Sequence, residues 1–143
     1  MVDDGQPAGE VYDWFIRGLR LLESGSPDAA AHLLGHARAH EPESASILEA
    51  LARATFDAGR YHEAHGLFGE LAEAAPDNDY ARFGLGLARM RTGDVPGAIE
   101  QLALAAVMRP ERADYQRALR EARATLRARQ QALQDQPAEG QAG

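Results

Sequence analysis

Cysteine is absent from this sequence, which excludes disulfide bonds, thiolate metal sites and cysteine nucleophiles. Long apolar runs are absent too, and none approaches the roughly 18 residues of a membrane-spanning helix. Residues 1–10 are acidic and lack an apolar stretch, so we expect no secretory signal, no membrane partner and a cytoplasmic protein. Lysine is also missing, and this arginine-, alanine- and glycine-rich composition is typical of a GC-rich, bacterial genome.

Catalytic motifs are missing as well. Serine, histidine and aspartate occur, but no serine lies in the Gly-x-Ser-x-Gly context of a nucleophile elbow. The sequence has no glycine-rich phosphate-binding loop and no metalloprotease motif. We therefore predict a protein that is not an enzyme and that uses no cofactor.

Charge is distributed unevenly along the chain. The formal net charge is −7, which argues against a nucleic-acid-binding protein. Residues 109–129 nevertheless contain seven arginines and three acidic residues, a net charge of +4, so the rest of the chain carries −11. This basic segment is the one place where the sequence suggests contact with nucleic acid or with an acidic protein.

Most of the chain repeats with a period of 34 residues, which indicates a repeat architecture. Five series of residues follow this period: Pro42, Pro76 and Pro110; Gly25, Gly59 and Gly93; Ala30, Ala64 and Ala98; Leu34, Phe68 and Leu102; and Gly18, Ala52 and Gly86. Proline and glycine interrupt helices, so each period is expected to contain two helices joined by a turn. The sequence predicts a stack of helical hairpins.

Apolar spacing and turn residues together predict seven helices. The expected ranges are 11–24, 27–41, 44–58, 61–75, 79–92, a sixth helix from its cap Asp94 to the residue before Pro110, and 112–133. We divide the chain into a disordered N-terminus (1–10), one domain (11–134) and a disordered tail (135–143). The domain comprises repeats 11–44, 45–78 and 79–112 and a capping helix, 113–134, with a polar outer side.

The repeated residues resemble the tetratricopeptide-repeat pattern Trp-x2-Leu-Gly-x2-Tyr, Ala-x3-Phe, Pro. The first unit has Trp14, Arg17, Gly18, Leu21, Ala30, Leu34 and Pro42; the second has Leu48, Leu51, Ala52, Thr55, Ala64, Phe68 and Pro76; the third has Arg82, Leu85, Gly86, Arg89, Ala98, Leu102 and Pro110. Arg17, Arg82 and Arg89 depart from the pattern. The resemblance implies an all-α fold: a right-handed superhelical stack of three hairpins with a C-terminal solvating helix.

The same resemblance implies a concave groove, lined by the first helix of each hairpin, in which partners bind. By helical position we expect a partner-binding set of Tyr12, Phe15, Leu19, Leu22, Glu49, Arg53, Phe56, Tyr80, Phe83, Leu87 and Met90, with Ser46 beside them. The groove is thus expected to be apolar and aromatic at both flanks and polar at its centre. We expect Phe15, Leu19, Phe83 and Leu87 to be the anchors.

The family's best-known groove chemistry is a clamp for a C-terminal carboxylate, built from Lys, Asn and Arg side chains. This chain has Phe15, Leu19, Ala50, Tyr80 and Gly84 where those polar groups would be expected, so we reject such a clamp. The expected ligand is an apolar helix or extended peptide of an unidentified protein. The alternatives are a homo-oligomer that uses the groove on itself, a chaperone-like shield of a client segment, and a nucleic-acid accessory protein.

Two charged or titratable sets allow more than one interpretation. Glu49 and Arg53 have the spacing of an intrahelical ion pair, but Arg53 could instead bind an acidic group of the partner. A row of histidines, His32, His36 and His40, is followed by His62 and His65. We expect a solvated face rather than a metal site or a pH switch there, because no acidic residue completes a ligand set.

Overall fold

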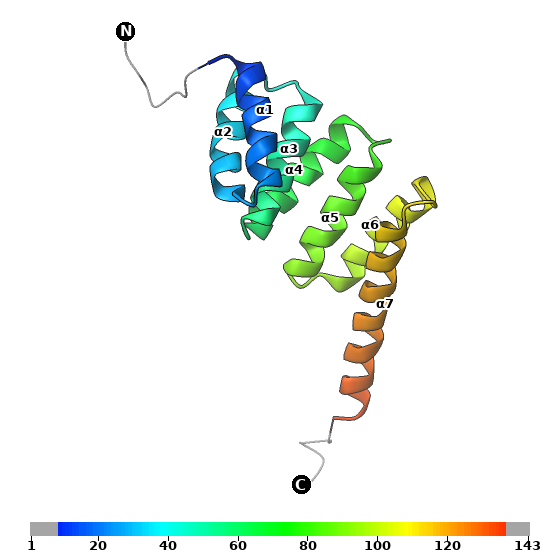
Figure 1. Ribbon diagram of the computed structural model, residues 1–143. Coiled ribbons are helices and arrows are strands. Elements are labelled where there is room, and N and C mark those ends of the chain that lie inside the picture. The colour runs from blue at the N-terminus through cyan, green and yellow to red at the C-terminus, as the bar shows by residue number, and fades with distance from the viewer. Residues whose placement is uncertain (1–8, 137–143) are drawn as a thin grey trace.

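The computed structural model describes residues 9–136 and shows an all-α, right-handed superhelical stack (Figure 1). Within that range the chain forms seven helices and no strand: α1 (Val11–Glu23), α2 (Pro27–His40), α3 (Ala45–Asp57), α4 (Tyr61–Ala74), α5 (Asp79–Arg91), α6 (Val95–Met108) and α7 (Ala113–Gln134). Every predicted helix is present, with ends within one or two residues of those expected. Residues 1–8 and 137–143, which include most of the predicted disordered termini, lie outside the described residues.

The turns inside the hairpins contain the glycine and cap residues predicted for them. Gly25, Gly59 and Gly93 all have positive φ, between 81° and 96°, which is the left-handed conformation that ends a helix and that glycine adopts without strain. Asp94 caps α6 by accepting a hydrogen bond from the Gly97 amide at 3.0 Å. Ser26 occupies the cap position before Pro27, but its side chain makes no capping hydrogen bond.

Small residues bring the helices of the stack close together. A Cβ atom on Gly18 would lie 2.6 Å from Leu34 Cγ, and one on Gly86 would lie 2.7 Å from Leu102 Cγ. Because carbon atoms pack at about 3.5–4.0 Å, only glycine permits these approaches without movement of the neighbour. The repeated small residues therefore set the distance between α1 and α2 and between α5 and α6.

Two arginines that depart from the repeat pattern tie helices together in the third unit. The Arg89 guanidinium donates to the carbonyl of Gly97 on α6 at 3.2 Å and to His65 Nε2 on α4 at 3.3 Å. Arg82 donates to Gln101 Oε1 at 3.4 Å. Both arginines are half-buried, so their stems pack while their charged ends reach polar partners.

The last helix covers the end of the stack. Tyr115, Leu119 and Ala122 are buried against α5 and α6, while the opposite side of α7 is polar, as predicted. Tyr115 also donates a hydrogen bond to Asp79 Oδ2 at 2.6 Å, which fixes the start of α7 to the start of α5. In Figure 1 the C-terminal half of α7 extends well beyond the other helices.

Candidate partner-binding groove

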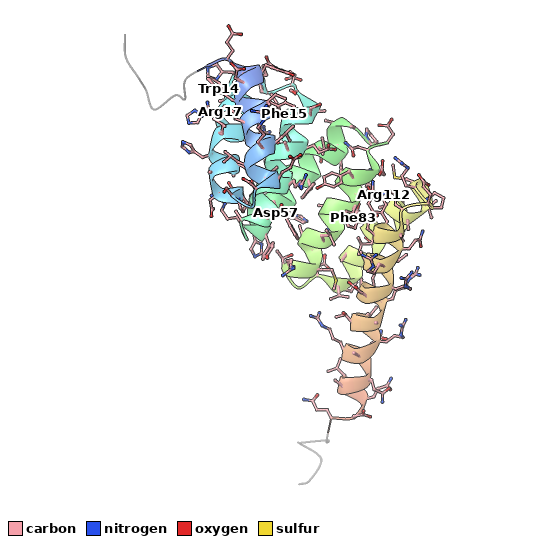
Figure 2. The ribbon with its side chains drawn as sticks, viewed as in Figure 1. Trp14, Phe15, Arg17, Asp57, Phe83 and Arg112 are labelled. Atoms are coloured by element: carbon pink, nitrogen blue, oxygen red, sulfur yellow. The ribbon has the colours of Figure 1, made fainter. Side chains whose placement is uncertain are left out.

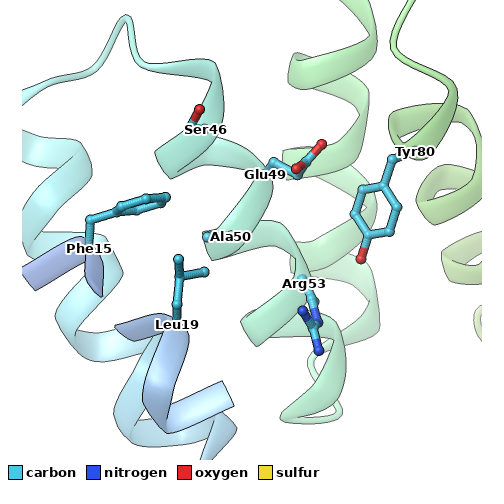
Figure 3. Close-up of a pocket in the computed structure, with 7 residues that line it drawn as sticks. All are labelled: Phe15, Leu19, Ser46, Glu49, Ala50, Arg53 and Tyr80. Atoms are coloured by element: carbon cyan, nitrogen blue, oxygen red, sulfur yellow. The ribbon is translucent and has the colours of Figure 1, made fainter. Parts of the chain in front are cut away.

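The first helices of the three hairpins enclose a hollow on one side of the stack. Its central cavity has a volume of about 390 Å³ and is lined by Phe15 and Leu19 from α1, by Ser46, Glu49, Ala50 and Arg53 from α3, and by Tyr80 from α5. Figure 3 shows Phe15 and Leu19 on one wall and Tyr80 on the opposite wall, with Ala50 between them. Five residues of the predicted set therefore meet around one cavity.

Two smaller cavities adjoin the central one. One, of about 260 Å³, shares Phe15 and Ser46 with it and adds Val11, Tyr12, Glu41, Ser44 and Ile47. The other, of about 100 Å³, shares Arg53 and Tyr80 and adds Phe56, Asp57, Phe68, Phe83, Gly84 and Leu87. We call the surface lined by these three cavities the groove. It runs across α1, α3 and α5, from Tyr12 to Leu87.

The polar centre of the groove is organised differently from the sequence expectation. Arg53 does not pair with Glu49; its Nε lies 3.8 Å from Asp57 Oδ2, one turn further along α3. Glu49 instead accepts a hydrogen bond from Asn78 Nδ2 at 3.4 Å, and the Asn78 side chain also caps α5 through the Ala81 amide. The predicted ion pair between Glu49 and Arg53 is therefore wrong, because Glu49 contacts Asn78 and Arg53 contacts Asp57 instead.

The groove carries a negative charge. Three acidic residues line its cavities, Glu41, Glu49 and Asp57, against a single arginine, Arg53. Tyr80 adds no charge at neutral pH, since the usual pKa of its hydroxyl is 10.0 and burial raises that pKa further. The net charge of the lining is thus about −2, which favours a cationic ligand over an anionic one.

Leu22 does not line the groove, and its assignment to the partner-binding set is wrong. It is 7% exposed and packs with Leu34 and Ala50 in the core. Leu22 follows Trp14 and Gly18 at a spacing of four residues, and all three face α2. The end of α1 is therefore covered by the second helix of its own hairpin.

The third unit offers less free apolar surface than the sequence suggested. The Phe83 ring stacks on Tyr115 of α7 with centroids 4.5 Å apart, and Leu87 packs against the core between α6 and α7. Met90 packs against the same core and lines none of the three groove cavities. Phe83 and Leu87 are half-buried, as Phe15 and Leu19 on α1 are, so the anchors at both flanks present only part of their surface. Figure 2 labels Phe15 on α1 and Phe83 on α5.

Several lining residues were not in the predicted set. Glu41, Ser44 and Ile47 line the cavity next to Tyr12, and Asp57 lines the one next to Phe83. The spacing of four residues between Arg53 and Asp57 could have identified Asp57 from the sequence, because residues four apart are neighbours on a helix surface. No signal identified Glu41, because it lies in the connection between α2 and α3 and outside the periodic helix face.

The histidine row lies on α2, away from the groove, and packs in part against Trp14. The His40 and His36 rings meet the Trp14 ring edge-on, with centroids 4.9 and 6.5 Å away. Burial, and then the charge of Arg89, lower the pKa of His65 below the usual 6.5. Within residues 9–136 no group of three or more histidine, aspartate or glutamate side chains is arranged to hold a metal ion.

None of the helices of residues 9–136 combines the length and the apolar character that crossing a membrane requires.

Comparison with known proteins places the fold. Two family models, each described as a tetratricopeptide repeat, match residues 49–113 and 21–65, which together span 21–113. The solved structure of the first such domain of human RPAP3 superposes with a TM-score of 0.78 at 15% identity, covering 85% of this chain and 96% of that one. A structure of MamA from MSR-1 superposes with a TM-score of 0.74 at 26% identity, covering 92% and 75%.

A third structure contains a bound peptide. It is the first tetratricopeptide-repeat domain of Spaghetti (RPAP3) with the HSP90 peptide SRMEEVD, and its TM-score is 0.76 at 16% identity, covering 87% of this chain and 96% of that one. No curated protein matches the sequence significantly.

Proposed function

The chain belongs to the tetratricopeptide-repeat family, and from that premise we propose that it is an adaptor or scaffold whose groove binds an apolar helix or extended peptide of a partner protein. Domains of this family are non-catalytic protein-interaction modules, and this chain is one of them. The proposal concerns the ligand and the surface that receives it.

One observation carries the proposal: the groove has exposed apolar walls on both sides of its polar centre. Phe15, Leu19 and Tyr80 line the central cavity, and Tyr12 extends the apolar surface beyond it with a side chain that is 71% exposed. An exposed apolar surface in a hollow is typical of an interaction site, and an amphipathic helix or an extended apolar segment is the ligand that fits it.

The peptide bound by RPAP3 contains three acidic residues and suits a cationic groove. Here the one lining arginine, Arg53, is already paired with Asp57, and Glu49 stands beside it. An acidic peptide would bring negative charge to a surface of net charge about −2, which is unfavourable. We therefore assign this groove an apolar ligand without acidic groups at its centre.

An affinity capture from a lysate of the source organism tests the proposal. The native chain is compared with Leu19→Glu, which places a carboxylate in the apolar wall, and with Ser46→Trp, which fills the cavity from an exposed position. Val107→Glu is the matched control, because Val107 is 79% exposed and lies on α6, outside the groove. Each variant is first shown to be helical by circular dichroism.

The proposal expects one or more proteins that the native chain and Val107→Glu both retain and that both groove variants lose. Retention of the same proteins by all four chains would refute it. Ser46→Trp keeps the result interpretable if Leu19→Glu loses helicity, because Leu19 also packs against the core whereas Ser46 does not.

A further inference from the structure

Helix α7 is longer than the stack that it covers. Beyond Ala122 only Thr125 and Leu126 are half-buried, and every residue from Arg127 to Gln134 is exposed. We call residues 123–134 the overhang; Figure 1 shows it projecting away from α1. Most of its residues are alanine, arginine, glutamine and leucine, which have the highest helix propensities, so the helix continues there without a covering partner.

The overhang continues the apolar face by which α7 binds its own stack. Leu119, which is buried, is followed at intervals of seven residues by Leu126 and by Leu133, which is 71% exposed. Because an α-helix turns about 100° per residue, these leucines form one ridge in line with Tyr115. The same interface thus extends past the end of the molecule, with nothing in the described chain to receive it.

The ridge is flanked by positive charge alone. The overhang contains three arginines, Arg123, Arg127 and Arg129, and no acidic residue. By helical position Arg123 and Arg127 lie on one side of the ridge and Arg129 on the other, whereas Ala124 and Gln131 lie on the opposite face. The overhang is therefore an amphipathic cationic helix.

The groove has the complementary chemistry: apolar walls at Phe15 and Leu19 and a net charge of about −2 from Glu41, Glu49 and Asp57 against Arg53. We infer that the overhang of one copy of this chain binds in the groove of a second copy.

Two other arrangements are disfavoured by the same observations. The overhang cannot enter its own groove, because α7 is packed as one straight helix on α5 and α6 and projects away from α1 (Figure 1). Two overhangs packed against each other would bring six arginines together without a counter-charge. Binding of overhang to groove is head-to-tail, so it produces either a closed ring or an open chain of copies.

The inference rests on the proposed function, since it uses the same groove and names one ligand for it. Mass is measured by light scattering and sedimentation over a range of protein concentrations, at low and at high salt. The native chain is expected to associate with rising concentration, and more weakly in high salt, because the exposed charges are then screened. A native chain that stays monomeric under all conditions would overturn the inference.

Substitutions in the overhang test which face associates. Leu126→Glu with Leu133→Glu places charge on the ridge and should weaken association by at least about 10- to 100-fold, which is the factor for the burial of one leucine side chain and therefore a lower bound for two. Ala124→Glu with Gln131→Glu makes the same change of charge on the opposite, exposed face and should leave the association within about threefold of native. Equal loss in both variants, or none in the first, contradicts the inference.

A charge exchange tests the two surfaces together. Glu41→Arg with Glu49→Arg changes the net charge of the groove lining from about −2 to about +2. Arg123→Glu with Arg127→Glu changes the net charge of the overhang from +3 to −1. Each of these two variants alone should associate at least about tenfold more weakly than native. An equimolar mixture should recover association, because an acidic overhang then meets a cationic groove. A mixture that remains monomeric overturns the inference, as does a monomeric native chain whose overhang binds RNA in a salt-dependent way.

The outcomes separate this inference from the proposed function. A monomeric chain that still loses a captured protein on Ser46→Trp removes the head-to-tail contact and leaves the adaptor proposal intact. In the opposite outcome the native chain associates through its overhang but captures no other protein. If the variant with Leu126→Glu and Leu133→Glu, whose groove is then open, also captures none, the contact is supported and the adaptor proposal is refuted.

Discussion

Replacing Gly84 by alanine tests how neighbouring hairpins pack beneath the groove. In the first and third units a leucine of the second helix meets a glycine within its hairpin and an alanine on the next helix: Leu34 packs against Ala50, and Leu102 against Ala118. The middle unit reverses the order. Phe68 packs against Ala52 within its hairpin, and a Cβ on Gly84 of the next helix would overlap the phenyl ring.

The expected size of the effect follows from two opposing terms. Overpacking a well-packed core costs about 1–3 kcal/mol, and Phe68 is only 2% exposed, so its ring has no solvent-side space to enter. Alanine also gains about 1 kcal/mol of helix propensity over glycine. Because the ring cannot move aside, we expect an overpacking cost in the upper part of that range, about 2–3 kcal/mol, so Gly84→Ala should lower the free energy of unfolding by about 1–2 kcal/mol.

Gly69→Ala is the matched control for that measurement. Gly69 lies within α4, and a Cβ there would have no neighbour within 4 Å, so only the propensity term applies. It should raise the free energy of unfolding by about 0.5–1 kcal/mol. Urea denaturation followed by circular dichroism measures both variants under the same conditions.

A compensating variant completes the test. Adding Phe68→Leu and Ala52→Gly to Gly84→Ala gives the middle unit the Gly–Leu–Ala arrangement of the other two. If the packing argument holds, this triple variant is more stable than Gly84→Ala with Phe68 retained, despite the helix-propensity cost of the Ala52→Gly change. Equal stability of Gly84→Ala and Gly69→Ala, or no recovery in the triple variant, refutes the reasoning.

Substitutions at three further positions test single contacts. Tyr115→Phe removes the hydrogen bond to Asp79 and should lower the free energy of unfolding by about 1–2 kcal/mol, measured by urea denaturation; no change would mean that this bond does not hold α7. Asn78→Ala removes the cap of α5 and should cost about 1 kcal/mol in the same assay, whereas Asn78→Asp keeps a capping oxygen and should cost less. Burial and Arg89 lower the pKa of His65, so the unfolded chain binds a proton first and stability should fall as pH drops below about 6.5. Comparison of the thermal unfolding of native protein and His65→Gln at about pH 8 and about pH 5 checks this, since the variant should lose less stability than the native chain on acidification.

The groove shows where reasoning from sequence stops being sufficient. Helical spacing assigns the predicted groove residues to corresponding faces of three helices. The structure brings five of them around one cavity: Phe15, Leu19, Glu49, Arg53 and Tyr80. Their role in binding a partner stays a prediction. Spacing alone, however, assigns a residue to a face of its own helix, and it does not say which neighbouring helix covers that face.

Leu22, Met90 and Phe83 illustrate that limit. Leu22 is covered by α2, Met90 packs against the core between α6 and α7, and Phe83 stacks on Tyr115. The spacing of Glu49 and Arg53 likewise did not show which partners they have. The rotamer of Arg53 directs it to Asp57 on the same helix, and Glu49 accepts a hydrogen bond from Asn78, the cap residue of α5.

The sequence by itself determined the family, the seven helices and the turns between them, because these depend on local properties. Proline and glycine end helices wherever they occur, and a period of 34 residues repeats the same local choices three times. Only the tertiary structure decided which apolar side chains remain accessible and how far α7 extends past the stack. Accessibility is a property of the neighbours that cover a residue, and the distance between the end of α6 and the end of α7 exists only once the helices are packed.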